Sequence, residues 1–526
     1  MTAQRLLHDL LLQRAYLKEH DRLALTCDGQ SYTFGHLIEA SQRLATVLCN
    51  GGLERGDRVA IFLDNSWASA VAIFGTLMAG GVIVLVNPQT KTEKLQFILD
   101  DSGARVLIAQ SRLEEIFRPA IQRLGRPIML LRSDHVSKQS NDSLFAAIDS
   151  AEPLTESTQV IPLDLAAIIY TSGSTGNPKG VMQTHQSMTF AVGSILEYLR
   201  LTHDDSILCV LPLSFDYGLY QLLMAVALGA RLVLERSFTF LGDILERIRA
   251  DAITVIPGVP TIFANLIAAH CRAALCFPLV TRVTNTAAAL PEEFIGTLRE
   301  IFPNALIYKM YGLTECKRVC YLEPELLDAK PGSVGKAIPG TEVYLLSAEQ
   351  RPVEPGQIGT LYVRGPHLML GYWNRPDLTE QMLKPGKLPG ERVLCTHDLF
   401  RMDADGFLYF VGRTDDIIKT RGEKVSPAEV EGVLHRIPGV REAAVVGVPD
   451  PVLGQALWAY VVTDSTMRLS PQAIRARCTE YLEPHSLPTN VIIRNDLPRS
   501  ANGKVNKREL LSEPPTPNTD SIEAAK

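Results

Sequence analysis

A loop rich in glycine and hydroxyl groups lies near residue 175 and has the composition of a phosphate site. An apolar run, Ala167–Tyr170, leads into Thr171-Ser172-Gly173-Ser174-Thr175-Gly176-Asn177-Pro178-Lys179-Gly180. Glycines let backbone N–H groups approach an anion closely, hydroxyls donate further hydrogen bonds, and the lysine supplies positive charge. The common P-loop has Gly-Lys-Ser/Thr entering a helix, whereas here Pro178 precedes the lysine and Gly180 follows it. The segment therefore predicts a phosphate-binding loop of a different kind.

Four more segments with chemically useful side chains follow this loop. They are Tyr311-Gly312-Leu313-Thr314-Glu315, Cys395-Thr396-His397-Asp398, Gly412-Arg413-Thr414-Asp415-Asp416-Ile417-Ile418-Lys419 and Asn502-Gly503-Lys504-Val505. In this order and spacing, the five segments resemble the motifs of the adenylate-forming superfamily of acyl-CoA synthetases, amino-acid adenylation domains and luciferases. The resemblance covers about residues 10–512. It implies an enzyme that uses ATP to form an acyl-adenylate, releases pyrophosphate and passes the acyl group to a thiol.

The resemblance implies that Lys504, Thr314 and Glu315 carry the adenylation step. Activation brings two anions together, and two like unit charges about 4 Å apart repel by about 4 kcal/mol at an effective dielectric constant of about 20. Lys504 would bridge the substrate carboxylate and the α-phosphate, Thr314 would contact phosphate, and Glu315 would bind Mg²⁺. ATP and Mg²⁺ are therefore the expected cofactors.

The resemblance also implies the remaining ATP contacts. Tyr311, followed by Gly312, would stack on adenine, while Asp398 and Arg413 would contact the ribose. His397 stands where the family usually has glycine, which leaves the local backbone shape open. The phosphates would be bound by Thr171, Ser172, Gly173, Ser174, Thr175, Gly176 and Lys179.

Asp415 and Gly422 are the positions at which the resemblance predicts movement and thiol entry. Asp415 would be the hinge about which a C-terminal domain rotates between adenylation and thioester formation. The rotation would remove Lys504 from the site and open a tunnel for a pantetheine thiol. Gly422 would lie against that tunnel.

The run Leu211–Leu219 is the part that separates the branches of the superfamily. Its Phe215-Asp216 resembles amino-acid adenylation domains, in which the aspartate holds the α-ammonium group of the substrate. Fatty-acyl and aryl-CoA synthetases usually have histidine at the position of Phe215. A buried ammonium needs a carboxylate partner to offset its desolvation. The alternative is that Asp216 caps a helix that begins at Tyr217.

Three further side chains are expected to contact the substrate. Tyr217 and Tyr220 would share a helix face near Asp216 and wall a small site, which would suit a compact ring such as proline. Arg318, close after the Tyr-Gly-Leu-Thr-Glu segment, could pair with a second carboxylate on the substrate or with Asp216.

These residues favour a ligase for a small amino or imino acid, with L-proline as the specific expectation. The acyl group would pass to the phosphopantetheine of a separate acyl or peptidyl carrier protein, as in secondary-metabolite biosynthesis. Only a short polar tail follows residue 513, so no carrier domain is expected in this chain. The alternative is an AMP-forming acyl-CoA synthetase for a small or aromatic organic acid, with CoA as its partner.

The strands and helices that must position these residues can be predicted from the hydrophobic pattern. Short apolar runs typical of buried strands alternate with helical stretches over the first four-fifths of the chain, which predicts parallel α/β layers. From about residue 333, short runs between Pro and Gly turns predict a small β-rich part. The expected strands include 59–62, 106–109, 207–210, 231–234, 342–346, 359–363, 406–410, 442–448 and 456–462, and the expected helices include 33–48, 243–250 and 426–437.

The predicted fold class is α/β. It has a large layered N-terminal domain with a small β subdomain, followed by a mobile C-terminal α+β domain. The predicted boundaries are 1–412 for the adenylation domain, with 333–412 as its β-rich subdomain, 413–416 for the hinge, 417–513 for the lid domain and 514–526 for a disordered tail.

Composition excludes several other classes of protein. The formal net charge is −6 with no long basic run, so no nucleic acid partner is expected. Nine cysteines without a C-x-x-C pair indicate free thiols in a reducing cytoplasm. The apolar run Ala70–Val86 is divided by Gly80-Gly81, and it predicts a buried helix and strand instead of a membrane span of about 20 residues. We therefore expect a cytoplasmic protein with no membrane partner.

Overall fold

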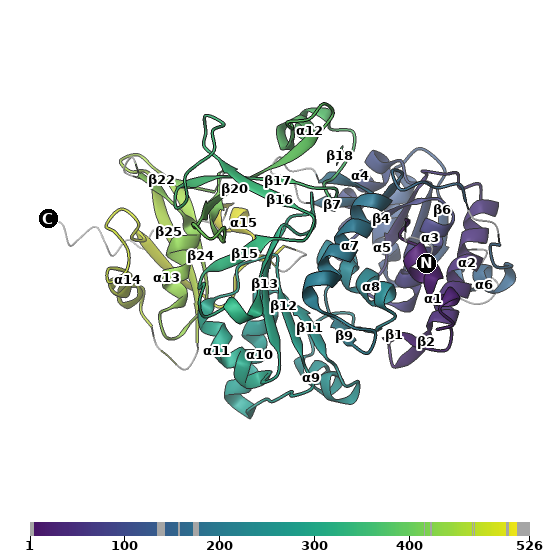
Figure 1. The fold of residues 1–526 in the computed structure, drawn as a ribbon, viewed down its shortest axis with the longest axis horizontal. Helices are drawn as coiled ribbons and strands as arrows, with labels where there is room; N and C mark the ends of the chain where they lie inside the picture. Colours follow the sequence, from purple (N-terminus) through teal and green to yellow (C-terminus); the bar gives the residue numbers. More distant parts are fainter. Residues whose placement is uncertain are drawn as a thin grey trace. The chain divides into compact units, whose positions relative to one another are not determined.

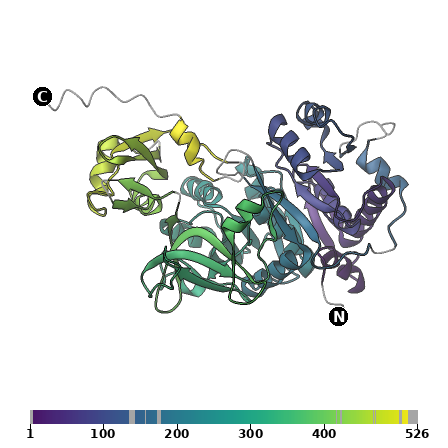
Figure 2. The same cartoon turned by 90° about the horizontal axis from the view of Figure 1, so that it is seen from above.

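The computed structural model describes residues 5–133, 142–155, 158–171, 178–414, 416–420, 423–464, 467, 469–500 and 504–512. The chain forms two compact units, drawn in Figures 1 and 2. The first comprises Met1–Gln357, Leu361–Thr396 and Met402–Tyr409, and the second comprises Ile358–Thr360, His397–Arg401 and Phe410–Lys526. The predicted α/β class with a larger and a smaller part is confirmed. The predicted domain boundaries and hinge motion stay predictions.

A seven-stranded sheet in the first unit carries the predicted phosphate loop. Its strands are β3 (Arg58–Phe62), β4 (Val82–Leu85), β5 (Val106–Ala109), β6 (Met129–Arg132), β7 (Leu165–Thr171), β8 (Lys179–Thr184) and β18 (Gly371–Tyr372). The strand order is β18-β8-β7-β4-β3-β5-β6, and the strands from β7 to β6 are parallel. Every residue of β4 is buried, as its Val-Ile-Val-Leu sequence predicts for a strand covered on both faces.

A second sheet of fourteen strands has a parallel centre. Its strands are β1 (Leu23–Cys27), β2 (Gln30–Thr33), β9 (Ser206–Cys209), β10 (Arg231–Leu234), β11 (Val255–Gly258), β12 (Arg282–Asn285), β13 (Leu306–Tyr311), β14 (Cys320–Leu322), β15 (Ser333–Ala337), β16 (Glu342–Leu346), β17 (Ile358–Arg364), β19 (Leu383–Pro385), β20 (Arg392–Met402) and β21 (Leu408–Arg413). The order is β16-β17-β20-β21-β15-β14-β13-β12-β11-β9-β10-β1-β2, with β19 on β20. β10, β9, β11, β12 and β13 pair in parallel, and β14 and β15 follow antiparallel. The short strands predicted after residue 333 therefore extend this sheet.

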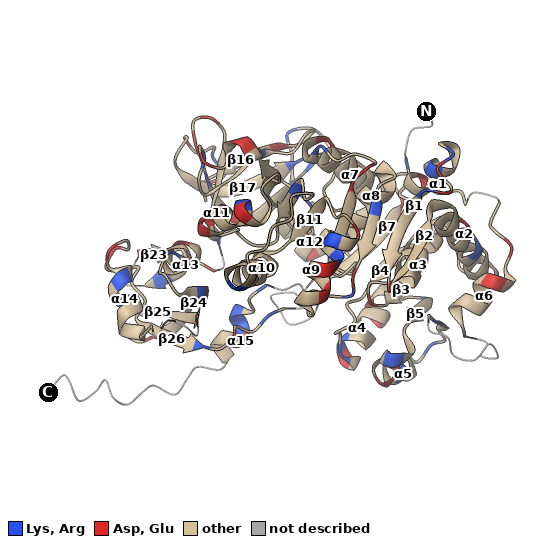
Figure 3. Ribbon diagram, turned by 90° about the horizontal axis from the view of Figure 1, so that it is seen from below, with Lys and Arg blue, Asp and Glu red and all other residues tan. Residues whose placement is uncertain are grey.

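Helices of the first unit pack against these sheets. They are α1 (Asp9–Tyr16), α2 (Phe34–Asn50), α3 (Trp67–Met78), α4 (Thr92–Ser102), α5 (Glu114–Gln122), α6 (Leu144–Ser150), α7 (His185–Leu199), α8 (Asp216–Leu228), α9 (Leu241–Ala250), α10 (Pro260–Ala273), α11 (Glu292–Ile301) and α12 (Pro376–Met382), with short 3₁₀ helices at Ser111–Leu113 and Pro324–Leu326. The apolar run Ala70–Val86 forms most of α3, a turn and β4, as predicted. Basic and acidic residues are interspersed along helices such as α4, α5 and α9 (Figure 3).

The second unit contains a five-stranded sheet with three helices packed on it. Its elements are β22 (Ile418–Thr420), β23 (Glu423–Val425), α13 (Pro427–His435), β24 (Val440–Asp450), β25 (Gly454–Thr463), α14 (Pro471–Cys478), β26 (Asn490–Arg494) and α15 (Lys507–Ser512). The order is β23-β22-β25-β24, with β26 parallel to β25. Val430 and Leu434 of α13 and Ile474 of α14 are buried in its core. The hydroxyl of Tyr460 donates to Leu510 O at 3.0 Å, which ties α15 to the sheet.

Two expectations from composition can be compared with the described residues. None of the described helices combines the length and the apolar character that crossing a membrane requires. All nine cysteines are free thiols, as predicted.

Candidate active site

The two strands that flank the predicted phosphate loop form an antiparallel pair. Thr171 ends β7, Lys179 begins β8, and the two residues are partners in the ladder. Both ends of the loop are therefore held together at the end of β7, which lies beside the parallel strand β4. The predicted loop residues Ser172, Gly173, Ser174, Thr175 and Gly176 lie outside the described residues.

The short strand β18 places an aromatic residue beside the start of β8. β18 pairs antiparallel with β8, and the N–H of Trp373 donates to Gly180 O at 2.7 Å. Nζ of Lys179 lies 5.4 Å from the centre of the Tyr372 ring. The hydroxyl of Tyr372 donates a 2.6 Å hydrogen bond to Oε1 of Glu315. Tyr372, which is 4% exposed, thus contacts two of the predicted ATP-site residues.

A tight turn after β13 presents Thr314 and Glu315. The N–H of Lys317 donates to Leu313 O at 2.6 Å, and Lys317 has a φ of +65°. Gly312 is required in this turn, because a Cβ at that position would lie 2.1 Å from the carbonyl oxygen of Lys317.

The backbone of this turn is also anchored from outside. Nε2 of Gln183 donates to Thr314 O at 3.0 Å, and the N–H of Met369 donates to Glu315 O at 2.7 Å. Tyr311, Thr314 and Glu315 are half-buried. The turn therefore has a fixed backbone and presents its side chains at the carboxyl end of a strand, where ligands bind in open α/β sheets.

Lys317 supports the turn from the interior and is 1% exposed. Its ammonium group donates to Oε1 of Gln183, to Oγ of Ser187 at 3.1 Å and to the carbonyl of His367 at 2.8 Å. Burial lowers the pKa of Lys317 to about 7, although the nearby negative charge of Asp216 acts in the opposite direction. Through Gln183, this buried lysine is linked to the turn that carries the predicted catalytic residues.

The first two turns of α8 carry the predicted substrate-binding residues. Asp216, Tyr217 and Tyr220 are buried, with exposed fractions of 6%, 1% and 1%. Gly218 lets the helix approach the preceding loop closely, because a Cβ there would lie 2.2 Å from Pro212 O. The structure thus brings the three side chains together inside the first unit.

Asp216 is the first residue of α8, and Phe215 is its N-cap residue. Oδ1 of Asp216 accepts a hydrogen bond from the N–H of Tyr217 at 2.8 Å. N–H groups in the first turn of a helix have no helical acceptor, so this bond stabilises the helix end. The capping interpretation of Asp216 therefore holds in part, although the helix begins one residue earlier than predicted.

Arg318 covers the aromatic face of Tyr217. Its guanidinium carbon lies 4.7 Å from the ring centre, within the range of a cation–π contact. The hydroxyl of Tyr217 donates to Thr284 O at 2.8 Å and ties α8 to β12. Burial raises the pKa of Tyr217 to about 12, with Arg318 acting in the opposite direction. Among the described residues no carboxylate lies within ion-pair distance of Arg318, so its predicted pairing with Asp216 is absent.

The predicted ribose contacts lie in the second unit. Nε of Arg413 is 3.7 Å from Oδ1 of Asp398, which is 8% exposed. His397 has a φ of +58°, the left-handed conformation that glycine adopts without strain. His397 therefore adopts a conformation that a glycine at this position could also take. The N–H of Thr414 donates to His397 O at 2.9 Å.

Lys504 is exposed in the second unit. The N–H of Ser500 donates to Lys504 O at 2.7 Å, next to an isolated bridge between Arg499 and Val505. The lysine therefore lies within a short antiparallel pairing of the segments around Arg499 and Val505. The predicted hinge residue Asp415 and tunnel residue Gly422 lie outside the described residues.

Glu315 has the chemistry that a magnesium ion needs. The described residues contain no group of three or more His, Cys, Asp or Glu side chains placed to hold a metal ion. Mg²⁺ is commonly bound by one or two carboxylates together with water and substrate phosphates. Glu315, held in place by Tyr372, fits a site of that kind, in which the ion would be bound together with ATP.

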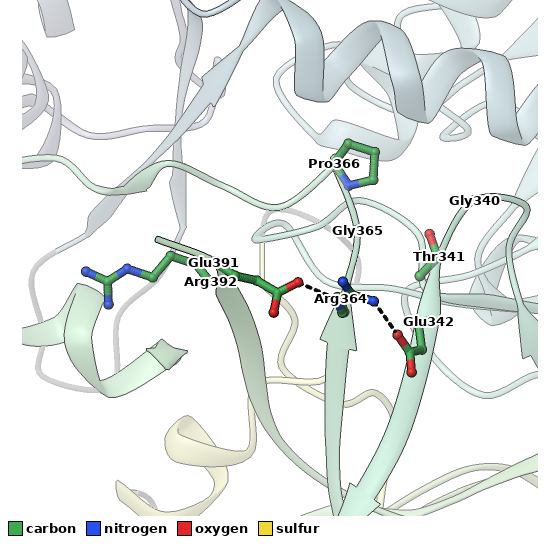
Figure 4. Close-up of a pocket in the computed structure, with 8 residues that line it drawn as sticks. All are labelled: Gly340, Thr341, Glu342, Arg364, Gly365, Pro366, Glu391 and Arg392. Atoms are coloured by element: carbon green, nitrogen blue, oxygen red, sulfur yellow. Dashed lines mark hydrogen bonds and ion pairs between the residues drawn. The ribbon is translucent and has the colours of Figure 1, made fainter. Parts of the chain in front are cut away.

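A cavity of about 550 Å³ lies in the β-strand part of the first unit. Arg364 at its wall forms ion pairs with Glu342 at 2.8 Å and with Glu391 (Figure 4). The other lining residues are Gly340, Thr341, Gly365, Pro366 and Arg392. None of the predicted site residues that the structure describes lines this cavity.

Tyr372, Gln183 and Lys317 contact the site but are not singled out by the sequence patterns. Tyr372 reaches Glu315 only because β18 pairs with β8, a contact between segments about 190 residues apart. Lys317 stands next to a recognised segment, but its sequence position gives no sign of burial. The one local signal is the Gly-Tyr-Trp run at 371–373, an aromatic pair after a glycine.

Comparisons with known proteins agree over most of the chain. The family model described as AMP-binding enzyme matches residues 12–373, and the AMP-binding enzyme C-terminal domain matches residues 429–504. The chain is 30% identical to a long-chain-fatty-acid–CoA ligase of Escherichia coli O157:H7, over 96% of this chain and 94% of that protein. It is 31% identical to 2-succinylbenzoate–CoA ligase of Bacillus subtilis (strain 168), over 95% and 96%. The structure of the anthranilate CoA ligase AuaEII in complex with anthranoyl-AMP superposes with a TM-score of 0.89 at 25% identity, over 97% and 98% of the two chains.

Proposed function

The chain belongs to the AMP-binding enzyme family, and on this premise we propose that it is an acyl-CoA synthetase for a small or aromatic organic acid. It is an AMP-forming acid–thiol ligase, which uses ATP to form an acyl-adenylate and transfers the acyl group to a thiol. The choice of acid and the choice of CoA as the thiol are the proposed steps.

The chain's own residues would counter the charge that builds up during adenylation. Lys179 and the loop it follows would neutralise the phosphates released as pyrophosphate. Glu315, oriented by Tyr372, would bind Mg²⁺, which offsets charge on phosphate oxygens. Lys504 would bridge the carboxylate and the α-phosphate, and Thr314 would contact phosphate.

Side chains fill the space between α8 and β12, and this packing is the observation that supports a small acid as substrate. The ring of Tyr217 is covered by Arg318, and its hydroxyl is bonded to Thr284. These buried side chains fill the space around the first turn of α8, which carries the predicted substrate-binding residues. A short or planar acid would be the better fit.

The choice of CoA is supported by the relatives. The two curated relatives and the superposed structure described above are all named as CoA ligases. They match this chain over nearly its whole length, including the region after residue 413 that would present the thiol.

A second candidate is the ligation of an amino or imino acid, such as L-proline, to a separate carrier protein. Burial of Asp216 favours it, because a buried carboxylate beside the substrate could hold an ammonium group. Asp216 nevertheless lies close enough to buried Lys317 for the two charges to interact. That cation reduces the need for an ammonium from the substrate, so the organic acid is the first choice.

Substrate-dependent exchange of pyrophosphate into ATP tests the proposal. The panel would contain the amino acids together with short aliphatic and aromatic acids. The best acid would then be assayed for AMP release with CoA and with a phosphopantetheinylated carrier protein. Exchange with organic acids and CoA-dependent AMP release would support the proposal. Exchange confined to amino acids would favour the second candidate, and no exchange with any acid would overturn both.

A further inference from the structure

Arg318 is a buried cation beside the first turns of α8, which carry the predicted substrate-binding residues. It is 4% exposed, and its guanidinium stacks on Tyr217 of α8. Glu315, three residues earlier, has its side chain against Tyr372 of β18. The left-handed residue Lys317 turns the backbone between them. The two side chains therefore serve different elements, Glu315 toward β18 and Arg318 toward α8.

Arg318 forms no ion pair within the described part of the chain. Nη1 donates to the carbonyl of Lys317 at 2.9 Å, and no described carboxylate lies within ion-pair distance. Nε is buried and has no hydrogen-bond partner in the structure. A buried charge without a counter-ion is costly, and functional sites accept this cost when a ligand supplies the opposite charge.

Other hydrogen-bonding groups on α8 and in the segments next to it are also buried without partners. The hydroxyl of Tyr220 has none, and the ionisation of this residue responds to both Asp216 and Arg318, which places it near them. Tyr217 is bonded to Thr284, and the next two residues of that segment have unpartnered buried atoms as well. In the segments that flank Tyr217 and Thr284, the buried atoms without partners are Oγ of Ser214, the hydroxyl of Tyr220, Nδ2 of Asn285 and Oγ1 of Thr286, in addition to Nε of Arg318. All of them can donate a hydrogen bond, so a ligand rich in acceptors would satisfy them.

Lys317 cannot take the same role, although it is the other buried cation. Its ammonium already has three acceptors from Gln183, Ser187 and His367. Of the two adjacent cations, Arg318 is therefore the one with capacity left for a ligand.

We propose that Arg318 binds a second anionic group of the substrate, at the end opposite the carboxylate that is adenylated. The substrate would then be a dicarboxylic acid, or an acid with an equivalent anionic group, and this inference rests on the proposed organic-acid ligase function. The planar guanidinium suits a carboxylate because it can donate two parallel hydrogen bonds.

Pairs of acids that differ in one carboxylate test this inference. Pyrophosphate exchange would be measured with glutarate against pentanoate and with terephthalate against benzoate. We expect the wild-type enzyme to have the higher kcat/KM for the diacid in at least one pair. Arg318→Leu should lower kcat/KM for the diacid by about 10- to 100-fold, the effect of losing hydrogen bonds to a charged group, and should change that for the monoacid by less than about 3-fold. Arg318→Lys, which keeps the charge, should retain part of the preference.

Controls separate this inference from the proposed function. Arg299→Leu removes an arginine that pairs with Asp328 at 2.9 Å on the surface of the same unit. It should leave kcat/KM unchanged for both the diacid and the monoacid. A wild-type preference for both monoacids would overturn the role of Arg318 but leave the ligase function in place. Equal losses for both acids, or a raised KM for MgATP, would show that Arg318 binds the reacting carboxylate or phosphate instead. If Arg318→Leu does not fold, the wild-type selectivity and Arg318→Lys decide the question. No exchange with any acid would instead count against the proposed function.

Discussion

The hydroxyl of Tyr372 donates a 2.6 Å hydrogen bond to Oε1 of Glu315. The ring of the same tyrosine faces Nζ of Lys179 at 5.4 Å. One buried side chain on β18 therefore touches the proposed magnesium-binding carboxylate and the lysine that follows the phosphate loop. Neither contact involves the organic acid, so Tyr372 should affect ATP and Mg²⁺ in particular.

Tyr372→Phe should lower kcat/KM for MgATP by about 10- to 100-fold, because a hydrogen bond to a charged group contributes about 1.5–3 kcal/mol. The Mg²⁺ concentration for half-maximal activity should rise, while KM for the acid should stay near its original value. Magnesium titrations of pyrophosphate exchange measure both. Tyr362→Phe is the matched control, since that hydroxyl bonds to Gln350 at 2.9 Å and should be dispensable. An unchanged magnesium requirement in Tyr372→Phe would contradict the positioning role.

Lys504→Ala should reduce adenylation at least about 100-fold, the scale on which removal of one group that stabilises transition-state charge acts. Thioester formation from a supplied acyl-adenylate should persist, because the proposed role of Lys504 ends when the adenylate has formed. Arg508→Ala, a change to an exposed basic residue of α15, is the control. Equal loss of both half-reactions in Lys504→Ala would refute the assigned role.

Asp216→Asn distinguishes the two candidate substrates. With an organic acid, removal of this negative charge should leave KM unchanged or lower it, because the substrate is an anion. With an amino acid, KM should rise about 10- to 100-fold from loss of the partner for the ammonium. KM values for the best acid of each kind, from pyrophosphate exchange, give the answer. A large increase in the organic acid KM, with ATP binding intact, would run against the organic-acid proposal.

Lys317 should make stability depend on pH in a defined direction. Its pKa is lowered by burial from 10.5 to about 7 in the folded protein. Between these values the unfolded chain binds a proton that the folded protein lacks, so folded-state stability rises with pH, by at most about 1.4 kcal/mol per pH unit. Below pH 7 both states are protonated, and the full cost of the buried charge is present.

The Lys317→Met variant isolates this contribution. The thermal midpoint of the wild-type protein should increase relative to that of Lys317→Met between pH 7 and 9. Cys316, next to it in sequence, has a pKa raised by burial and acts in the opposite direction, but it is common to both proteins. Lys94→Met on the exposed side of α4 serves as the control and should follow the wild type at every pH. Parallel curves for wild type and Lys317→Met would mean that the lysine is not titrating in this range.

Strands and helices were predictable where one local pattern decides them. The Val-Ile-Val-Leu run of β4 favours a strand buried on both faces, because its residues are apolar and mostly β-branched. The segments around Lys179 and Glu315 were predictable because their residue types and order are distinctive. At His397 the sequence left the backbone open, and the structure has a φ of +58° there. The local residue type did not decide that conformation, because a non-glycine residue can adopt it at a modest cost in energy.

Contacts between distant segments could not be predicted in this way. Tyr372 belongs to the site through the pairing of β18 with β8, and no periodicity within either segment specifies that pairing. Lys317 has a charged side chain that sequence patterns assign to the surface, yet three acceptors hold it in the interior. The strands after residue 333 are recognisable one by one, but their attachment to β14 depends on the register of a whole sheet.

Gly218 and Gly312 are positions in the site that cannot accept another residue, whereas neighbouring positions can. A methyl group at either would collide with a carbonyl oxygen, at 2.2 Å and 2.1 Å respectively. A mutant library aimed at new substrates would therefore lose most members that change these two glycines, whatever acid is offered. Variation at Tyr220 and Arg318, by contrast, would alter side chains on a backbone that stays in place. The substrate selectivity of this enzyme could therefore be altered by exchanging a few side chains on two turns whose backbone is fixed.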